Sequence, residues 1–331
     1  MLKWIFLICI LCLAAFVLLV SYGTYRVCFY NANKVPDDPY RLPVGEKYDA
    51  LKDQCFELIG GTLALPFEPV TIRSRDGLQL FAKLYRTDPK MPVVILMHGW
   101  HGIAERDFSA GTQIHLYNGL NVLLADQRAH QKSEGHTITF GIKERYDCLD
   151  WIGYVQKTFG TETPILIHGV SMGAATVLMA AGLPLPEQVC GVIADSPYTT
   201  PAAIIKKVTA DKGFPPAVVF PFVRLGSLLF GHMRLQSASA LEAVSRNRRP
   251  VMLIHGTGDA FVPCEMGDAL YAAANEPKFQ VKVADAPHVL AYMYDKKLYL
   301  ETLERFYAAA FASYGLRIRI SDRSWALQPV L

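Results

Sequence analysis

Residues 165–175 read Ile-Leu-Ile-His-Gly-Val-Ser-Met-Gly-Ala-Ala, an apolar run that passes directly into a Gly-x-Ser-x-Gly motif. Small residues that are compatible with a helix follow at once. This order predicts a strand, a sharp turn and a helix, with Ser171 at the apex of the turn. Gly169 and Gly173 flank the serine because a Cβ atom at either position would collide in so tight a turn. Ser171 is therefore the candidate nucleophile.

Short apolar runs recur along the chain with helical stretches between them. Strands that are buried on both faces look like this, and their alternation with helices predicts an α/β fold with a mainly parallel sheet flanked by helices. Two alternating segments joined at Asp76-Gly77 come first and predict a hairpin. The hairpin segments are 70–74 and 78–85, and the apolar runs are 93–97, 122–125, 165–168, 189–194, 251–255 and 279–283.

Two further reactive side chains follow later strands of the predicted sheet. Asp259 comes one loop after the run that ends at 255, and His288 comes one loop after the last run. Ligands bind outside the carboxyl ends of parallel strands, so we expect Ser171, Asp259 and His288 to meet there. His288 would accept the serine proton, and Asp259 would orient the imidazole. Asp285 is a rival, but it lies only three residues before His288, too near to reach the far ring nitrogen.

Several motifs together give the chain a family resemblance. Residues 69 to about 312 resemble an α/β-hydrolase of the serine-hydrolase type, similar to membrane-anchored bacterial hydrolases grouped with the serine aminopeptidase and lipase-like families. Ser171, Asp259 and His288 stand in the chain order that α/β-hydrolases use. The other segments that carry the match are His98-Gly99, Asp126-Gln127-Arg128, Asp195-Ser196-Pro197-Tyr198, His255-Gly256-Thr257-Gly258 and Val262-Pro263.

The resemblance implies an oxyanion hole made of the backbone N–H groups of Met172 and Trp100. Trp100 could equally line the pocket. One departure concerns the loop after Arg128, where Ala129 and Gln131 replace the glycines that the family commonly has. Both changes add side chains to a loop beside the site, which affects the expected shape of that loop and leaves the three reactive residues intact.

No strand-like apolar run is predicted in the roughly fifty residues between Pro197 and Arg249. In the fold that the chain resembles, an insertion at this point forms a cap over the site. Residues 214–231 carry one charge, Arg224, among large apolar residues. They could line an acyl-sized pocket, touch a membrane, or simply pack against the core. Three prolines at 215, 216 and 221 argue against a second membrane span.

Metal and cofactor chemistry is not expected. His98 and His101 have no Asp, Glu or Cys at ligand spacing nearby, so we expect His98 to pin the oxyanion loop by hydrogen bonds. The seven cysteines show neither metal-type spacing nor a disulfide framework. We predict no metal and no cofactor, and loss of activity on chelation that added zinc restores would contradict this.

The N-terminus predicts a membrane segment. Residues 5–20 are sixteen consecutive uncharged and almost wholly apolar positions, near the lower limit for a membrane-spanning helix. A cleaved signal peptide is the alternative, with Ser21-Tyr22-Gly23 as a poor cleavage site. We favour a single-pass anchor with the catalytic domain on the extracytoplasmic side. The formal charge of +3 and the lack of a basic run interleaved with aromatic residues argue against nucleic acid as a partner.

The predicted organisation has four parts. Residues 1–26 form the anchor, 27–68 a linker and a helix that leads into the domain, 69–314 the hydrolase domain with a cap at about 197–249, and 315–331 a C-terminal tail. The predicted function is a serine hydrolase that cleaves carboxylic esters, including lipid-like ones, through an acyl-enzyme.

Two alternatives remain open. One is a serine peptidase or aminopeptidase with the same three residues, which would need a cap carboxylate such as Glu242 or Asp211 to hold a peptide amine. The other is a silent hydrolase fold used for binding. The sequence does not define the oligomeric state.

Overall fold

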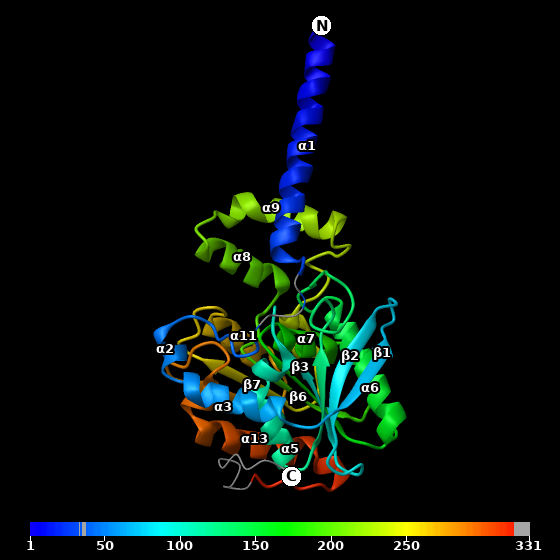
Figure 1. Cartoon of the computed structure of the whole chain (residues 1–331), viewed down its shortest axis with the longest axis vertical. Coiled ribbons are helices and arrows are strands. Elements are labelled where there is room, and N and C mark those ends of the chain that lie inside the picture. The colour runs from blue at the N-terminus through cyan, green and yellow to red at the C-terminus, as the bar shows by residue number, and fades with distance from the viewer. Residues whose placement is uncertain (33, 35–37, 321–331) are drawn as a thin grey trace.

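The computed structural model describes residues 1–32, 34 and 38–320. Eight strands form one sheet in the order β1-β2-β4-β3-β5-β6-β7-β8 (Figure 1). β2 pairs antiparallel with β1 and β4, and the other neighbours are parallel. The predictions of a mainly parallel sheet and of the hairpin are therefore confirmed. The strands are Glu68–Arg73 (β1), Gln79–Tyr85 (β2), Val93–Met97 (β3), Asn121–Asp126 (β4), Ile165–Val170 (β5), Val189–Asp195 (β6), Val251–Gly256 (β7) and Lys278–Val283 (β8).

Helices cover both faces of the sheet. One face is packed against α6, α7, α10 and α11, and the other against α5, α12 and α13. The α-helices are Leu2–Cys28 (α1), Glu46–Asp49 (α2), Lys52–Leu63 (α3), Ala104–Asp107 (α4), Ser109–Tyr117 (α5), Glu144–Phe159 (α6), Met172–Ala181 (α7), Pro201–Asp211 (α8), Pro216–Leu229 (α9), Ala240–Arg246 (α10), Cys264–Ala273 (α11), Ala291–Tyr294 (α12) and Lys296–Ala310 (α13), and a 3₁₀ turn spans Ala312–Tyr314.

The two-residue period of the strands divides the core into two layers. Ile95 and Met97 of β3 point to one layer, and Val94 and Leu96 point to the other. All five residues of this strand are buried, because a parallel strand in the middle of the sheet meets helices on both sides. This burial on both faces explains why the sequence of β3 is an unbroken apolar run.

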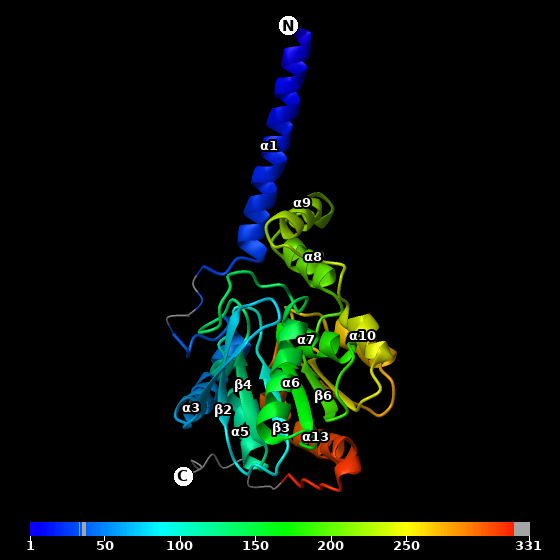
Figure 2. The ribbon, with the colours of Figure 1, turned by 90° about the vertical axis from the view of Figure 1, so that its right-hand side faces the viewer.

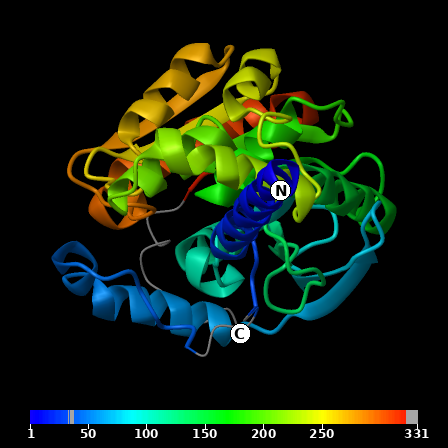
Figure 3. The same ribbon diagram turned by 90° about the horizontal axis from the view of Figure 1, so that it is seen from above.

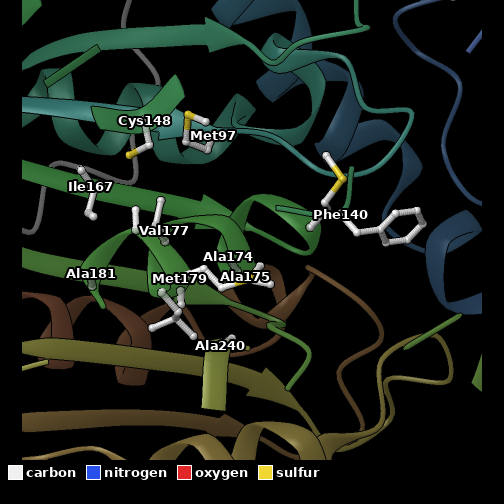
Figure 4. Close-up of a cluster of buried hydrophobic side chains, with 14 of the residues drawn as sticks. Met97, Phe140, Cys148, Ile167, Ala174, Ala175, Val177, Met179, Ala181 and Ala240 are labelled. Atoms are coloured by element: carbon white, nitrogen blue, oxygen red, sulfur yellow. The ribbon is translucent and has the colours of Figure 1, made fainter. Parts of the chain in front are cut away.

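Helix α7 is the best-buried helix of the domain, since each of its ten residues is buried. Figure 4 shows Ala175 and Val177 of α7 beside Ile167 of β5 and Met97 of β3, in one hydrophobic cluster. The small side chains at the start of α7 let it lie close against the sheet. This helix begins at the residue after Ser171, so its packing fixes the position of the serine.

Three helices lie outside this layered body. α1 projects away from the domain. α8 and α9 lie between the layered body and the projecting part of α1 (Figures 1 and 2). α1 is long and apolar enough to cross a membrane, a test that an N-terminal signal sequence also passes. Within α1 only Ser21 and Tyr25 are buried. The predicted cap segment, 197–249, thus divides: α8 and α9 leave the body, while α10 packs on α7. Of the predicted tail, 321–331 lie outside the described residues.

Candidate active site

The Gly-x-Ser-x-Gly segment forms a strained turn between β5 and α7. Ser171 has φ 54° and ψ −116°, a conformation that is costly for a residue with a side chain. A Cβ atom added at Gly173 would overlap the carbonyl oxygen of Met97, and one at Gly169 would overlap the carbonyl of Gly173. The backbone N–H of Ser171 donates to the carbonyl of Asp195 at 2.7 Å and fixes the turn to β6. The glycines therefore make room for backbone on both sides.

Replacing Gly173 with alanine should destabilise the fold severely. The new Cβ would meet backbone of β3, which cannot move aside as a flexible side chain could. Overpacking of this kind costs about 3 kcal/mol or more of unfolding free energy. Gly153→Ala in the middle of α6 is the matched control, because nothing lies within 4 Å of the Cβ position there; it should be neutral or stabilising. Equal melting temperatures for the two variants would contradict this account.

The structure brings the three predicted reactive residues together. His288 Nε2 lies 2.9 Å from Ser171 Oγ, and His288 Nδ1 lies 2.6 Å from Asp259 Oδ2. Ser171 comes from the turn after β5, Asp259 from the loop after β7 and His288 from the loop after β8. Asp285 is exposed, and its recorded contacts use its backbone: its N–H donates to Thr257 Oγ1 and its carbonyl accepts from Lys47 Nζ.

Asp259 is held as an anion by several donors. The backbone N–H groups of Phe261 and Val262 donate to its Oδ1 at 2.9 and 2.8 Å. Burial alone would raise the pKa of this carboxyl, but hydrogen bonds from His255 and His288 outweigh burial and hold the pKa below its usual value. The carboxylate therefore stays charged at neutral pH and can accept a hydrogen bond from His288 Nδ1.

A second carboxyl group lies near this network. Asp195 ends β6, is buried, and accepts a hydrogen bond from Ser196 Oγ at 3.0 Å. Burial raises its pKa to about 6, above the usual value of a carboxyl group. Nothing local in the sequence shows that the backbone of Asp195 supports the Ser171 turn, so the sequence predicts no role for Asp195 beyond its motif.

The predicted oxyanion loop is tied down from several sides. His98 donates from Nδ1 to the carbonyl of Gly99 at 2.8 Å and accepts the backbone N–H of Gln127 on Nε2 at 3.0 Å. Asp107 Oδ2 accepts the N–H of Gly99 at 3.0 Å. The N–H groups of Trp100 and Met172 form no hydrogen bond to another described residue, so both remain open to a ligand. The hydrogen bonds of His98 were predicted from the sequence, whereas the role of Asp107 was not.

The departures after Arg128 leave a left-handed backbone in place. Ala129 and Gln131 have φ values of 64° and 39°, a region that favours glycine. The added side chain of Gln131 has a use, because its Oε1 accepts the N–H of Ala104 at 3.2 Å at the start of α4. Arg128 itself is buried in ion pairs with Asp147 and Asp76. This motif is therefore structural support for the loops beside the site.

A cavity of about 810 Å³ opens beside Ser171 and His288. Part of its wall comes from residues 38–63, a segment that we name the strap. The strap contributes Asp38, Arg41, Leu42, Pro43, Tyr48, Cys55, Leu58 and Ile59. The described lining contains no residue from 197–249, so the segment predicted as a cap does not form this wall. The strap was predicted only as a linker and helix.

Hydrogen bonds fasten the strap to the loop that carries His288. Tyr48 Oη donates to the carbonyl of His288 at 3.2 Å, and Lys47 Nζ donates to the carbonyl of Asp285 at 2.7 Å. On the other side of the cavity, Arg106 donates to the carbonyl of Arg41 at 3.1 Å. The chain that follows α1 thus reaches the reactive residues. No pattern in its sequence announces these contacts, since they join segments more than 60 residues apart.

Comparisons with known proteins agree with this architecture. The family model described as the alpha/beta hydrolase fold matches residues 92–218. The uncharacterized protein YqkD of Bacillus subtilis is 27% identical over 209 residues, which cover 62% of this chain and 68% of YqkD. An esterase of Pyrococcus furiosus superposes with a TM-score of 0.61 and 25% identity, covering 74% of this chain and 91% of the esterase. Est1E of Butyrivibrio proteoclasticus, solved with ferulic acid bound, gives 0.54 and 26%, covering 71% and 95%.

The sheet order, the turn at Ser171 and these matches define the class of protein. The chain has the α/β-hydrolase fold, and the family-model match over residues 92–218 supports membership of that superfamily. This membership supports a hydrolase that acts on a small molecule. The roles of Ser171, Asp259, His288, Trp100 and Met172, and the absence of a metal or cofactor requirement, stay predictions.

Proposed function

We propose that this protein is a serine hydrolase that cleaves carboxylic esters through an acyl-enzyme. One observation carries the proposal: the hydrogen-bonded chain from Ser171 through His288 to Asp259 opens on a cavity. An alcohol is a weak nucleophile at neutral pH, so it needs a base within hydrogen-bond reach. His288 Nε2 is placed to accept the Ser171 proton as Oγ attacks the ester carbonyl.

The reaction then proceeds in two halves. Ser171 Oγ bonds to the carbonyl carbon, and the resulting oxyanion accepts hydrogen bonds from the backbone N–H groups of Trp100 and Met172. His288 returns the proton to the alkoxide that leaves, and the acyl group remains on Ser171. In the second half, His288 removes a proton from water, the water attacks the acyl carbon, and Ser171 leaves with that proton. Asp259 stabilises the imidazolium in both halves.

Ester cleavage suits this site better than peptide cleavage. Glu242 and Asp211, the carboxylates considered for a peptide amine, do not line the cavity as it is described. Two acids of the described chain do line it. Asp107 is engaged by Arg106 and by the N–H of Gly99, and Asp38 accepts the N–H of Tyr40 on Oδ1 at 2.8 Å. The names of the similar proteins, an esterase and a protein with bound ferulic acid, also favour carboxylic ester substrates.

A substrate panel tests the proposal. We expect the full-length protein in detergent to hydrolyse p-nitrophenyl esters of short and medium acyl chains faster than aminoacyl p-nitroanilides. Faster cleavage of the anilides would favour the peptidase. Hydrolysis of neither class by folded protein would favour the binding protein.

The strap should set the acyl length that the cavity accepts. Leu42 lines the cavity, whereas Val44, two residues later, is 99% exposed. Leu42→Trp should lower kcat/KM for the longest accepted ester by about 10-fold, and less for acetate esters, because it fills apolar space. Val44→Trp is the matched control and should leave the profile unchanged. The same profile for both variants would show that the strap does not limit the substrate.

We propose further that α1 is a retained membrane anchor. Tyr25 Oη forms a 2.7 Å hydrogen bond with Thr137 Oγ1, and Asn31 Nδ2 donates to the carbonyl of Ala129 at 2.8 Å. Phe29 is fully buried in the core. Cleavage after residue 23 would remove Ser21 and Tyr22, which contact Gly226 of α9 and Phe230 at its end, and the loss of these contacts favours an intact helix. The intact mass of the mature protein tests this directly.

The proposed side for the catalytic domain is extracytoplasmic. Lys3 lies just before the apolar run and favours a cytoplasmic start of the span under the positive-inside rule, whereas Arg26 and Lys34 after the run favour the opposite side. Digestion of the domain by protease added outside spheroplasts is the expected result. Protection until lysis would place it in the cytoplasm.

A further inference from the structure

The helix α9 has an apolar face that the rest of the described chain leaves uncovered. Phe214 just before the helix and Val218 within it are 58% and 61% exposed, and Leu228 and Leu229 are also exposed. With Ala217, Pro221 and the half-buried Leu225 these positions recur every three or four residues, so they form one stripe along the helix. An exposed stripe of this kind marks an interaction surface.

The position of α9 along α1 identifies what this stripe faces. The twenty residues 2–21 span about 30 Å as a helix, which is the thickness of the hydrocarbon core. α9 crosses α1 (Figure 3), and it does so beside the part of α1 nearest the domain (Figure 1). Gly226 allows the contact, since a Cβ atom there would overlap the carbonyl oxygen of Ser21. α9 therefore lies at the depth where the bilayer must end.

Aromatic and basic side chains gather at the same depth. The ring of Tyr22 lies 5.1 Å from that of Phe230, and the ring of Tyr25 lies 5.9 Å from it. Arg26 donates to Tyr22 Oη at 3.3 Å. Tyrosines and arginines at the end of a span are typical of the membrane–water boundary.

The charge of the two helices suits an anionic lipid surface. Asp211 is the one acidic residue of the described segment 197–239. The basic residues of that segment are Lys206, Lys207, Lys212, Arg224 and Arg234. A groove of about 450 Å³ beside α9 combines two of these cations with apolar groups, a mixture that matches lipid headgroups and the upper acyl chains. Its lining is Pro221, Arg224, Leu225, Leu228, Arg234 and Gln236.

We propose that α9, with α8 beneath it, lies in the membrane interface, with the 214–229 stripe in the lipid and Arg224 and Arg234 at the headgroup phosphates. This inference rests on the proposed anchoring by α1. It gives the protein a second membrane contact that holds the domain at a fixed orientation against the bilayer. A single helix joined to a domain would leave that orientation free.

Depth measurements on the full-length protein test the proposal. Cys9, Cys12 and Cys28 are the cysteines that are not buried, and Cys55 lines the cavity. Replacement of these four by serine leaves a background that an NBD (nitrobenzoxadiazole) dye does not label. Val218→Cys and Leu229→Cys then place the dye on the stripe. Lys297→Cys, on an exposed position of α13, is the control in water. The variant that keeps Cys12 reports on the span itself.

The labelled proteins are placed in nanodiscs of phosphatidylcholine with about one quarter phosphatidylglycerol. We expect a nitroxide near the headgroup end of the acyl chains to quench the labels at 218 and 229 about fivefold more than the label at 297. A nitroxide deep in the chain should quench the label at Cys12. If the labels at 218 and 229 are quenched no more than the label at 297 while the label at Cys12 is quenched, the proposed interfacial position of α9 is wrong and the proposed anchor is supported. If the label at Cys12 is also unquenched, both the proposed position of α9 and the proposed anchor are wrong.

One remaining outcome also contradicts the proposal. Labels at 218 and 229 that are shielded from a water-soluble quencher, yet are not quenched by the lipid nitroxide, would show that protein covers the stripe. The sites chosen are exposed, so the substitutions should not disturb folding. An unchanged melting temperature for each variant provides that check.

Discussion

Replacing Ser171 with alanine is expected to lower kcat for ester hydrolysis by about 10⁴-fold or more, since no acyl-enzyme can form without its hydroxyl. The fold should survive, because the side chain of Ser171 makes one recorded hydrogen bond, to His288 Nε2, while the turn is held by backbone. The steady-state rate with p-nitrophenyl esters and the melting temperature measure the two effects separately.

Ser109 provides the matched control for this variant. Ser109 lines the same cavity from the first turn of α5, and it is not part of the proposed proton path. Ser109→Ala should keep kcat within about threefold of the wild type, in line with the small effect of most substitutions outside the reacting atoms. Retention of the wild-type rate by Ser171→Ala would remove the proposed nucleophile from the mechanism.

Asp259→Asn should lower kcat by about 10⁴-fold while leaving the site assembled. The asparagine Oδ1 can still accept the N–H groups of Phe261 and Val262. Its NH₂ group then faces His288 Nδ1, to which it can only donate. The imidazole would be forced to carry its proton on Nε2, where it can no longer accept the proton of Ser171. The loss follows from the wrong tautomer.

Asp285→Asn separates this explanation from a general effect of charge near His288. Asp285 is exposed, and the backbone contacts recorded for it do not depend on its carboxylate. Its replacement should change kcat by less than about twofold. A larger loss from Asp285→Asn than from Asp259→Asn would exchange the roles of the two carboxyl groups.

Much of the fold could be predicted because its signals are local. The run 93–97 coincides with β3, and the run 189–194 lies within β6. Strands that are buried on both faces must be apolar at every position, so they stand out from the helices between them. The positions of Ser171, Asp259 and His288 followed from a general property of parallel sheets, whose carboxyl ends meet at one edge.

The strap and the path of α9 could not be predicted in the same way. Leu42 and Tyr48 lie in a mixed, proline-containing stretch with no periodicity, and their place in the cavity wall depends on contacts with residues far along the chain. The role of Asp107 could not be predicted for a similar reason. The short helix α4 brings Asp107 within hydrogen-bond distance of Gly99, and no local pattern in the sequence predicts that contact. For residues 214–231, composition alone left substrate, membrane and core equally open. The contact between α9 and α1 is the observation that supports the proposed membrane contact.

Covalent labelling with a fluorophosphonate probe tests the central claim most directly, since the probe reacts with a serine that a neighbouring base activates. The full-length wild-type protein should carry one adduct, and peptide mass spectrometry should locate it on Ser171. Ser171→Ala should remain unlabelled, and Asp259→Asn should react far more slowly. A folded wild-type protein that takes up no probe, or takes it up at another residue, would contradict the account.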